Sequence, residues 1–245
     1  MDKNYHIFCL GDSAATIELG TVINEELNNK ILAMQAWLQV NGFDGLKDII
    51  VAYSSLTIIY DPAIIKKIPS VQGPVFEWVK QKLSQAYYLS LPQEEDSHRI
   101  IRLPVCYEDE FGIDTAHVSA SQQLSREDIV NIHTASTYRV YMIGFLPGFP
   151  YMATLDERLV LPRKPKPVPV IAGSVGIAGS QTGIYPFNSP GGWNIIGRTP
   201  IGLFHPDSHG STLFRTGDRV QFYPISLKAF QEMEQQELVN IKYEE

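Results

Sequence analysis

Cysteine, positive charge and long apolar runs are scarce in this sequence of 245 residues, and each shortage excludes a class of protein. Two cysteines, Cys9 and Cys106, cannot form a disulfide framework, which favours reduced thiols. A formal net charge of −7 argues against nucleic acid as a partner. No apolar run has the length of a membrane span, and the first residues lack the pattern of a secretory signal. We therefore expect a cytoplasmic protein that binds neither nucleic acid nor membranes.

Familiar catalytic motifs are absent too. No lysine follows a glycine, so the sequence has no phosphate-binding P-loop, and it has no G-x-S-x-G nucleophile turn. Cysteine pairs at zinc spacing and a Met-Lys-Met biotin site are also missing. His205 and His209 lie four residues apart, but Pro206 and Gly210 argue against a helix that would align them. The sequence thus predicts neither a metal site nor attached biotin, and it locates no ATP site.

The charge that is present is unevenly distributed. Residues 158–206 contain no aspartate or glutamate, but they contain Arg158, Arg163, Lys164, Lys166 and Arg198. In an acidic protein such a segment is a candidate site for a small anion. The alternative is that solvated loops simply tolerate these side chains.

The first part of the chain alternates strand and helix patterns. We expect strands over residues 6–10, 14–19, 48–53 and 56–60. Apolar residues spaced three and four apart predict helices around 23–38 and 76–87. The order ββαββα predicts an α+β domain over 1–95, an open sheet with both helices on one side. A polar stretch at 93–97 is a plausible boundary.

The second part has a strand-rich pattern. Strands are expected at 99–107, 139–143 and 218–223, and Ser125 with Asp128 has the form of a capping box that opens a helix to about 136. Residues 144–202 hold ten of the 18 glycines and nine of the 16 prolines, which excludes helices there and leaves short strands and tight turns. We predict a mostly-β barrel over 96–225 and a terminal helix over 226–245.

Four motifs resemble one family closely. They are "MIGFLPGFPYM" at 142–152, "GSVGIAGSQTGIYPFNSPGGW" at 173–193, "IIGRTP" at 195–200 and "TGDRVQFYPI" at 216–225. The family is the one formerly called allophanate hydrolase subunit 1, which includes the B subunit of 5-oxoprolinase and the kinase inhibitor KipI. The resemblance extends to "GDSAATIELG" near the start and "VCYEDEFGID" at 105–114, so it covers essentially the whole chain. It implies an N-terminal α/β domain and a cyclophilin-like barrel.

The resemblance also implies partners. It suggests an ATP-dependent complex in which this chain, inert alone, acts with subunits A and C to convert 5-oxoproline to glutamate; ATP would be used by the complex. The alternative within the family is a KipI-like inhibitor that binds a sporulation-type sensor histidine kinase. Metabolism of allophanate or urea-derived amides is a further alternative, and a prolyl isomerase is suggested by the barrel alone. One departure is Pro167-Val168-Pro169, where the family often has a second arginine.

Candidate site residues lie mostly in or beside the glycine-rich motif. The guanidinium groups of Arg198 and Arg163 are suited to donate two parallel hydrogen bonds to a carboxylate. The alternative is a structural role, in which the arginine donates hydrogen bonds to backbone carbonyls of loops. We predict a substrate-binding set of Arg198, Arg163, Gln181, Thr182, Tyr185 and Phe145. His133 is the predicted proton-transfer group, because histidine titrates near neutrality. The alternative for His133 is a structural histidine at the end of its helix.

Overall fold

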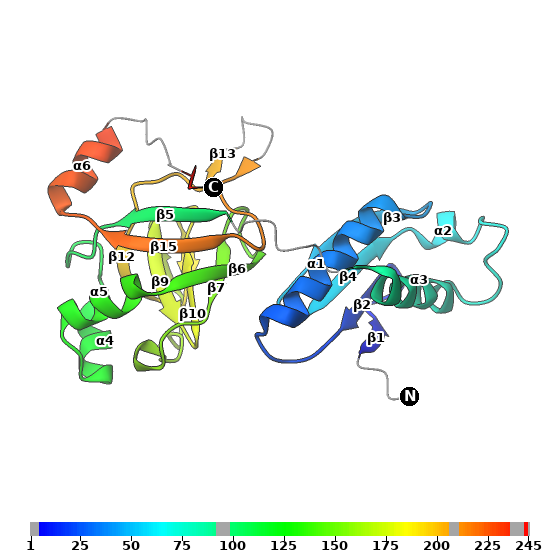
Figure 1. Ribbon diagram of the computed structural model, residues 1–245, viewed down its shortest axis with the longest axis horizontal. Helices are drawn as coiled ribbons and strands as arrows, with labels where there is room; N and C mark the ends of the chain where they lie inside the picture. The colour runs from blue at the N-terminus through cyan, green and yellow to red at the C-terminus, as the bar shows by residue number, and fades with distance from the viewer. Residues whose placement is uncertain (1–4, 92–98, 206–210, 236–242, 245) are drawn as a thin grey trace. The chain divides into compact units, whose positions relative to one another are not determined.

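The computed structural model describes residues 5–91, 99–205, 211–235 and 243–244 (Figure 1). The chain forms two compact units, Met1–Asp96 and Ser97–Glu245. The boundary that we placed after residue 95 lies outside the described residues. Among the helices of the described part, none is long and apolar enough to cross a membrane.

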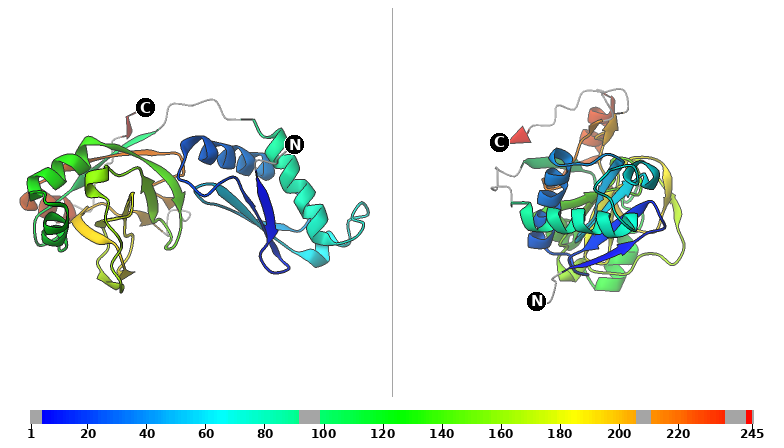
Figure 2. Two further views of the ribbon diagram at one scale, coloured as in Figure 1. Left: turned by 90° about the horizontal axis from the view of Figure 1, so that it is seen from below. Right: turned by 90° about the vertical axis from the view of Figure 1, so that its right-hand side faces the viewer.

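The first unit is a four-stranded antiparallel sheet with helices on one face. The strand order is β1-β2-β4-β3, with β1 at His6–Cys9, β2 at Ala14–Glu18, β3 at Leu46–Val51 and β4 at Ser55–Tyr60. Alternate residues of β4, namely Leu56, Ile58 and Tyr60, are buried. They share one core with α1 (Glu25–Val40) and α3 (Val75–Leu89), which lie beside each other on the sheet (Figure 2).

This unit differs from the expected ββαββα order by one short helix. After β4 the chain continues through Asp61 into α2 (Pro62–Ile65), which the sequence analysis did not predict. The carboxylate of Asp61 accepts hydrogen bonds from the backbone N–H groups of Ala63 and Ile64, and Pro62 stands in the first turn, where its missing N–H costs nothing. The coarser prediction, a mixed sheet-and-helix fold, is confirmed.

The second unit is an eight-stranded sheet that curls on itself (Figure 1). Its order is β12-β9-β10-β7-β6-β15-β5-β16. The bounds are β5 Ile100–Val105, β6 Thr137–Ile143, β7 Pro150–Ala153, β9 Ser174–Ala178, β10 Gln181–Ile184, β12 Asn194–Arg198, β15 Arg219–Pro224 and β16 Tyr243–Glu244. Cys106, just after β5, exchanges two backbone hydrogen bonds with Arg198 of β12, at 2.8 and 2.9 Å. These bonds join the edge strand β12 to the chain just after β5, the last strand but one at the other end of the sheet, so the sheet curls back on itself. A closer likeness to cyclophilin stays a prediction.

Short elements complete this unit. They are α4 (Thr115–Gln122), α5 (Arg126–Ala135), a 3₁₀ turn at Glu157–Leu159, two two-stranded ribbons and α6 (Leu227–Gln235). The ribbons pair β8 (Val168–Val170) with β11 (Ser189–Gly191), and β13 (Phe204–His205) with β14 (Ser211–Thr212). The capping box of Ser125 and Asp128 is present at the start of α5, as predicted.

One helix prediction is wrong at its end. The structure has no continuous helix over 226–245, because Tyr243–Glu244 forms β16 and pairs antiparallel with β5. Residues 236–242 of the expected helix lie outside the described residues. Pairing with a strand that lies far away in the sequence leaves no trace in local periodicity, which is why the pattern predicted a helix.

Candidate functional site

Neighbouring residues of β10 point to opposite sides of the barrel wall. Thr182 and Ile184 face inward, where Ile184 belongs to the main core. Tyr185, which directly follows β10, lies on the outer face with Phe149 and Trp193. Because side chains alternate along a strand, Gln181, which is half-buried, lies on the same outer face as Tyr185. Gln181 and Thr182 therefore do not share one site.

His133 is completely buried inside the barrel. Its Nδ1 lies 2.8 Å from the hydroxyl of Tyr107, its Nε2 lies 3.0 Å from Oγ1 of Thr182, and its ring stacks on Phe222 at 4.6 Å. The Thr182 hydroxyl donates to the carbonyl of Gly176 at 3.1 Å, so it accepts from His133. The proton is thus on Nε2, and Tyr107 donates to Nδ1.

This environment keeps His133 neutral. Burial lowers the pKa of His133 to about 3, because the apolar core disfavours the charged ring. The same burial raises the pKa of the Tyr107 hydroxyl. A side chain with no exposed surface and both ring nitrogens engaged has no route for exchanging a proton with a substrate in solution. The geometry favours the structural alternative for His133, with side-chain partners in place of the helix carbonyls.

Arg198 is likewise tied into the fold. Its guanidinium carbon lies 5.4 Å from the ring centre of Phe111 and 5.3 Å from that of Phe230 in α6. Its Nε donates to the carbonyl of Ala172 at 2.9 Å, and one terminal nitrogen lies 3.3 Å from a carboxylate oxygen of Glu234. These contacts are those of a structural arginine that joins a loop to α6.

Residues 158–206 contain no aspartate or glutamate, but carboxylates from other parts of the chain lie close to several of their cations. Arg158 pairs with Asp156 at 2.9 Å, and Lys164 pairs with Asp114 at 2.5 Å. Together with the Arg198–Glu234 pair, this satisfies three of the segment's five cations with carboxylates from outside it. Among the described residues, no carboxylate lies within ion-pair distance of Arg163.

Arg163 stands at the edge of an aromatic cluster on the outer face. A Cβ atom on Gly192 would lie only 3.2 Å from a terminal nitrogen of its guanidinium, so the side chain rests on bare glycine backbone. Tyr185, Trp193 and the half-buried Tyr151 form the cluster, with the rings of Tyr151 and Trp193 5.8 Å apart. We call Arg163, Tyr151, Tyr185, Trp193 and Gly192 the Arg163 site.

The charge of Arg163 acts on the hydroxyl groups of Tyr151 and Tyr185. Burial raises the pKa of Tyr151 and of Tyr185, and the nearby Arg163 charge acts in the opposite direction on both. An exposed arginine beside aromatic faces can hold a carboxylate by two parallel hydrogen bonds while the rings cover the rest of a small planar molecule.

The glycines of this region make room for large side chains. A Cβ at Gly191 would collide with the hydroxyl of Tyr185, and one at Gly183 would lie 2.9 Å from the ring of Phe149. Both glycines lie within strands, β11 and β10. At these two positions glycine makes room for an aromatic ring packed against the sheet, within the short strands that we expected for this region.

The remaining predicted residue, Phe145, lies in the turn between β6 and β7. It is 67% exposed, has a φ of +66° and meets Phe149 edge-on at 6.0 Å. Phe149 also contacts Tyr185 and Trp193, so Phe145 reaches the aromatic cluster of the Arg163 site only through Phe149. Tyr151 was missed by the sequence analysis; the available signal was its position in β7 two residues after Phe149, which places both side chains on the same face of the sheet.

No group of three or more histidine, cysteine, aspartate or glutamate side chains is close enough to hold a metal ion in the part of the chain that the structure describes. The exposed guanidinium and the neighbouring rings suit the Arg163 site to binding and orienting an anionic group.

Comparison with known proteins gives a consistent result. The family model of the carboxyltransferase domain, subdomains C and D, matches residues 5–214. The B subunit of 5-oxoprolinase from Bacillus subtilis (strain 168) is 44% identical over 232 residues, which cover 94% of this chain and 97% of that protein. The B subunit of 5-oxoprolinase from Haemophilus influenzae is 36% identical over 218 residues, covering 89% and 96%. The crystal structure of TTHA0988 superposes with a TM-score of 0.72 at 33% identity, covering 90% of this chain and 40% of that longer chain.

Proposed function

The chain belongs to the family of carboxyltransferase domains, subdomains C and D, and from this premise we propose that it is the B subunit of a 5-oxoprolinase. The observation that carries the proposal is the near full-length match, in both directions, to two proteins named as the B subunit of 5-oxoprolinase. In this proposal the chain acts with subunits A and C, which together open 5-oxoproline to glutamate with hydrolysis of ATP.

Within such a complex the Arg163 site binds the carboxylate of 5-oxoproline. The forked guanidinium matches a carboxylate, and the faces of Tyr151 and Trp193 suit a small five-membered ring. The supporting observation is that Arg163 has no carboxylate partner among the described residues, whereas Arg158, Lys164 and Arg198 each have one.

In this proposal the groups that carry out the chemical step come from the partner subunits. His133 is buried and neutral, and the Arg163 site holds no carboxylate or histidine that is poised as an acid or base. We therefore assign ring activation and the binding of ATP to the partner subunits, and binding of the substrate carboxylate to this chain.

Reconstitution tests the function directly. Purified subunits A and C are mixed with 5-oxoproline and ATP, with and without this chain, and glutamate release is measured. We expect release only when all three are present, with no activity from this chain alone. Equal glutamate release by A and C without this chain would overturn the proposal.

The kinase-inhibitor alternative predicts a different result. A KipI-like protein would bind the dimerisation domain of a sensor histidine kinase and reduce its autophosphorylation without subunits A or C. Adding the chain to such a kinase in the same set of assays separates the two functions.

A further inference from the structure

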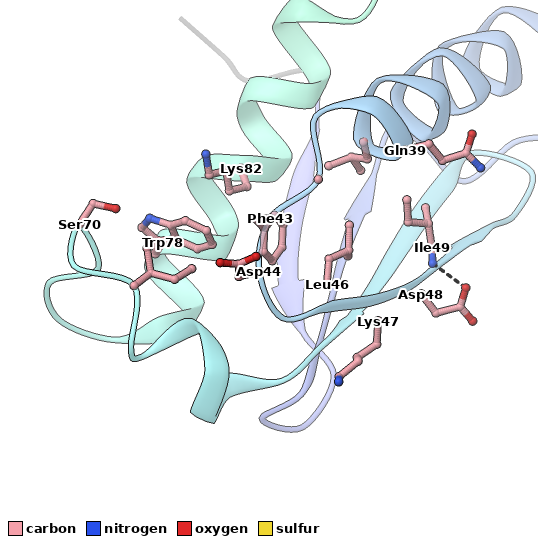
Figure 3. Close-up of a pocket in the computed structure, with 13 residues that line it drawn as sticks. Gln39, Phe43, Asp44, Leu46, Lys47, Asp48, Ile49, Ser70, Trp78 and Lys82 are labelled. Atoms are coloured by element: carbon pink, nitrogen blue, oxygen red, sulfur yellow. Dashed lines mark hydrogen bonds between the residues drawn. The ribbon is translucent and has the colours of Figure 1, made fainter.

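The groove of the first unit, shown in Figure 3, carries both signs of charge. Its charged lining residues are two lysines and two aspartates, namely Asp44, Lys47, Asp48 and Lys82. The ammonium of Lys47 lies 4.0 Å from the carboxylate of Asp61. A carboxylate oxygen of Asp48 accepts a hydrogen bond from the N–H of Ile49 at 2.8 Å. This groove therefore favours neither an anion nor a cation, unlike the Arg163 site of the second unit.

The residues on either side of Arg163 are each bonded to the chain at or just before β12. The side-chain amide of Asn194 donates to the carbonyl of Pro162 at 3.1 Å. On the other side, the N–H of Lys164 donates to the carbonyl of Gly192 at 2.7 Å. Gly192 is also the residue on which the guanidinium of Arg163 rests. The two hydrogen bonds thus fix the backbone on both sides of Arg163.

The side chain of Lys164 adds a further attachment. Its ammonium lies 2.5 Å from Oδ2 of Asp114, and each of the two side chains is only 17% exposed. The same Oδ2 accepts from the N–H of Ile195 at 2.7 Å, and the N–H of Asp114 donates to the carbonyl of Ile195 at 2.9 Å. Asp114 is therefore held by β12, and the ion pair ties Lys164 to that strand.

These attachments are made by polar groups that are costly to bury. Asn194 is 1% exposed, and its amide also donates to the carbonyl of Ile177 at 3.4 Å. A largely buried ion pair adds little net stability, because both charges lose their hydration, and apolar residues in its place are often equally stable. The Lys164–Asp114 pair is therefore better explained by the fixed geometry that it imposes than by stability.

We propose that three positioning residues hold Arg163 in the orientation in which its guanidinium receives a carboxylate. They are Lys164, Asp114 and Asn194, and they act through Arg163 without touching the ligand. A guanidinium that is held in advance loses less conformational entropy when it makes two parallel hydrogen bonds. The carboxylate is that of 5-oxoproline, and for this identity we rely on the proposed function.

Position and charge have opposite effects in the variant Asp114→Asn. Asparagine keeps an oxygen that can accept from Ile195, but it loses the ion pair with Lys164. Removal of the negative charge makes the surroundings of Arg163 more positive, so charge alone predicts tighter binding of an anion. Loss of position predicts weaker binding. We expect the dissociation constant of the full chain for 5-oxoproline, measured by isothermal titration calorimetry, to rise about threefold.

The variant Lys164→Met removes the same ion pair from its other side. Its matched control is Lys166→Met, which loses the same charge at an exposed residue two positions along the chain. We expect the dissociation constant to rise about fivefold in Lys164→Met and less than about twofold in Lys166→Met. Lys164→Arg, which can still pair with Asp114, should also stay within about twofold. In the reconstituted complex the KM for 5-oxoproline should rise in Lys164→Met with kcat unchanged.

The outcomes separate the positioning role from the proposed function. Tighter binding by Asp114→Asn, or equal losses in Lys164→Met and Lys166→Met, would overturn the positioning role. Circular dichroism checks that each variant is folded, and Asp114→Asn carries the test if Lys164→Met is not. Binding by the chain with the expected losses, beside a complex that releases no glutamate, would reject the proposed function and keep the positioning role. Absence of both binding and turnover with the unaltered chain would reject both.

Discussion

At the scale of single residues, ion pairing decides which cation is available to a ligand. Arg163 and Arg198 have the same side chain and lie in the same acid-free segment, residues 158–206. Arg198 is held between Phe111 and Phe230 and is paired with Glu234, whereas Arg163 is exposed on Gly192. The partners of Arg198 are distant in sequence, so the sequence could not separate the two arginines.

Arg163→Lys should therefore impair substrate binding more than turnover. Lysine keeps the charge but cannot make the two parallel hydrogen bonds of a guanidinium to a carboxylate. In the reconstituted complex we expect the KM for 5-oxoproline to rise about tenfold, with kcat changed less than threefold. Arg158→Lys, at an exposed arginine already paired with Asp156, is the matched control and should have no effect. An unchanged KM in Arg163→Lys would remove Arg163 from the site.

His133 should make the fold sensitive to mild acid. The folded pKa of about 3 lies below the ordinary value of 6.5, so the unfolded chain takes up a proton first as the pH falls. The stability that the neutral, buried His133 contributes is present above about pH 6.5 and is lost progressively below it, by about 1 kcal/mol between pH 7.5 and pH 5.5. Urea unfolding at both pH values measures it.

His133→Gln should remove the loss of unfolding free energy between pH 7.5 and pH 5.5, because glutamine does not titrate in this range. The control His117→Gln replaces an exposed histidine of α4 and should keep the full loss. The same pH dependence in His133→Gln as in the unmodified protein would contradict the prediction.

At the scale of elements, short sequence patterns predicted the start of α5 correctly but did not predict which side chains share a binding site. The capping box at Ser125 is local, because the side chain of Ser125 accepts from the N–H of Asp128 three residues ahead. The opposite orientations of Gln181 and Thr182 also follow from the two-residue period of a strand, and recognising β10 as a strand would have separated them.

Ser125→Ala should destabilise the second unit by about 1 kcal/mol, since the first turn of α5 loses its cap. The free energy of unfolding from urea titration measures the effect. Ser121→Ala is the control, because Ser121 is an exposed residue inside α4, where alanine favours the helix. A loss in Ser121→Ala as large as that in Ser125→Ala would show that the cap is not its cause.

At the scale of the whole molecule, each unit has its own apolar core. The core of the first unit joins α1, α3 and the sheet, and that of the second fills the curled sheet. A chain with two separate cores is expected to contain a part that folds alone. For the first unit the alternating burial of β4 and the apolar faces of both helices supply this core.

A fragment of residues 1–96 should accordingly fold by itself. We expect a helix-and-sheet circular dichroism spectrum and one cooperative transition in urea, because all partners of its core lie within the fragment. A fragment with no cooperative transition would show that its core needs the second unit.

The sequence by itself determined α1, α3 and α5, the strands β1 to β6 and β15, the capping box and the family, because these depend on local periodicity and on long motifs. Tertiary structure alone decided the pairing of Tyr243–Glu244 with β5, the burial of His133 between Tyr107 and Thr182, and the pairing of Lys164 with Asp114. The physical reason is the same in each case: the interacting groups come from distant parts of the chain. Burial and charge pairing, which set what a side chain can do, exist only once the chain has folded.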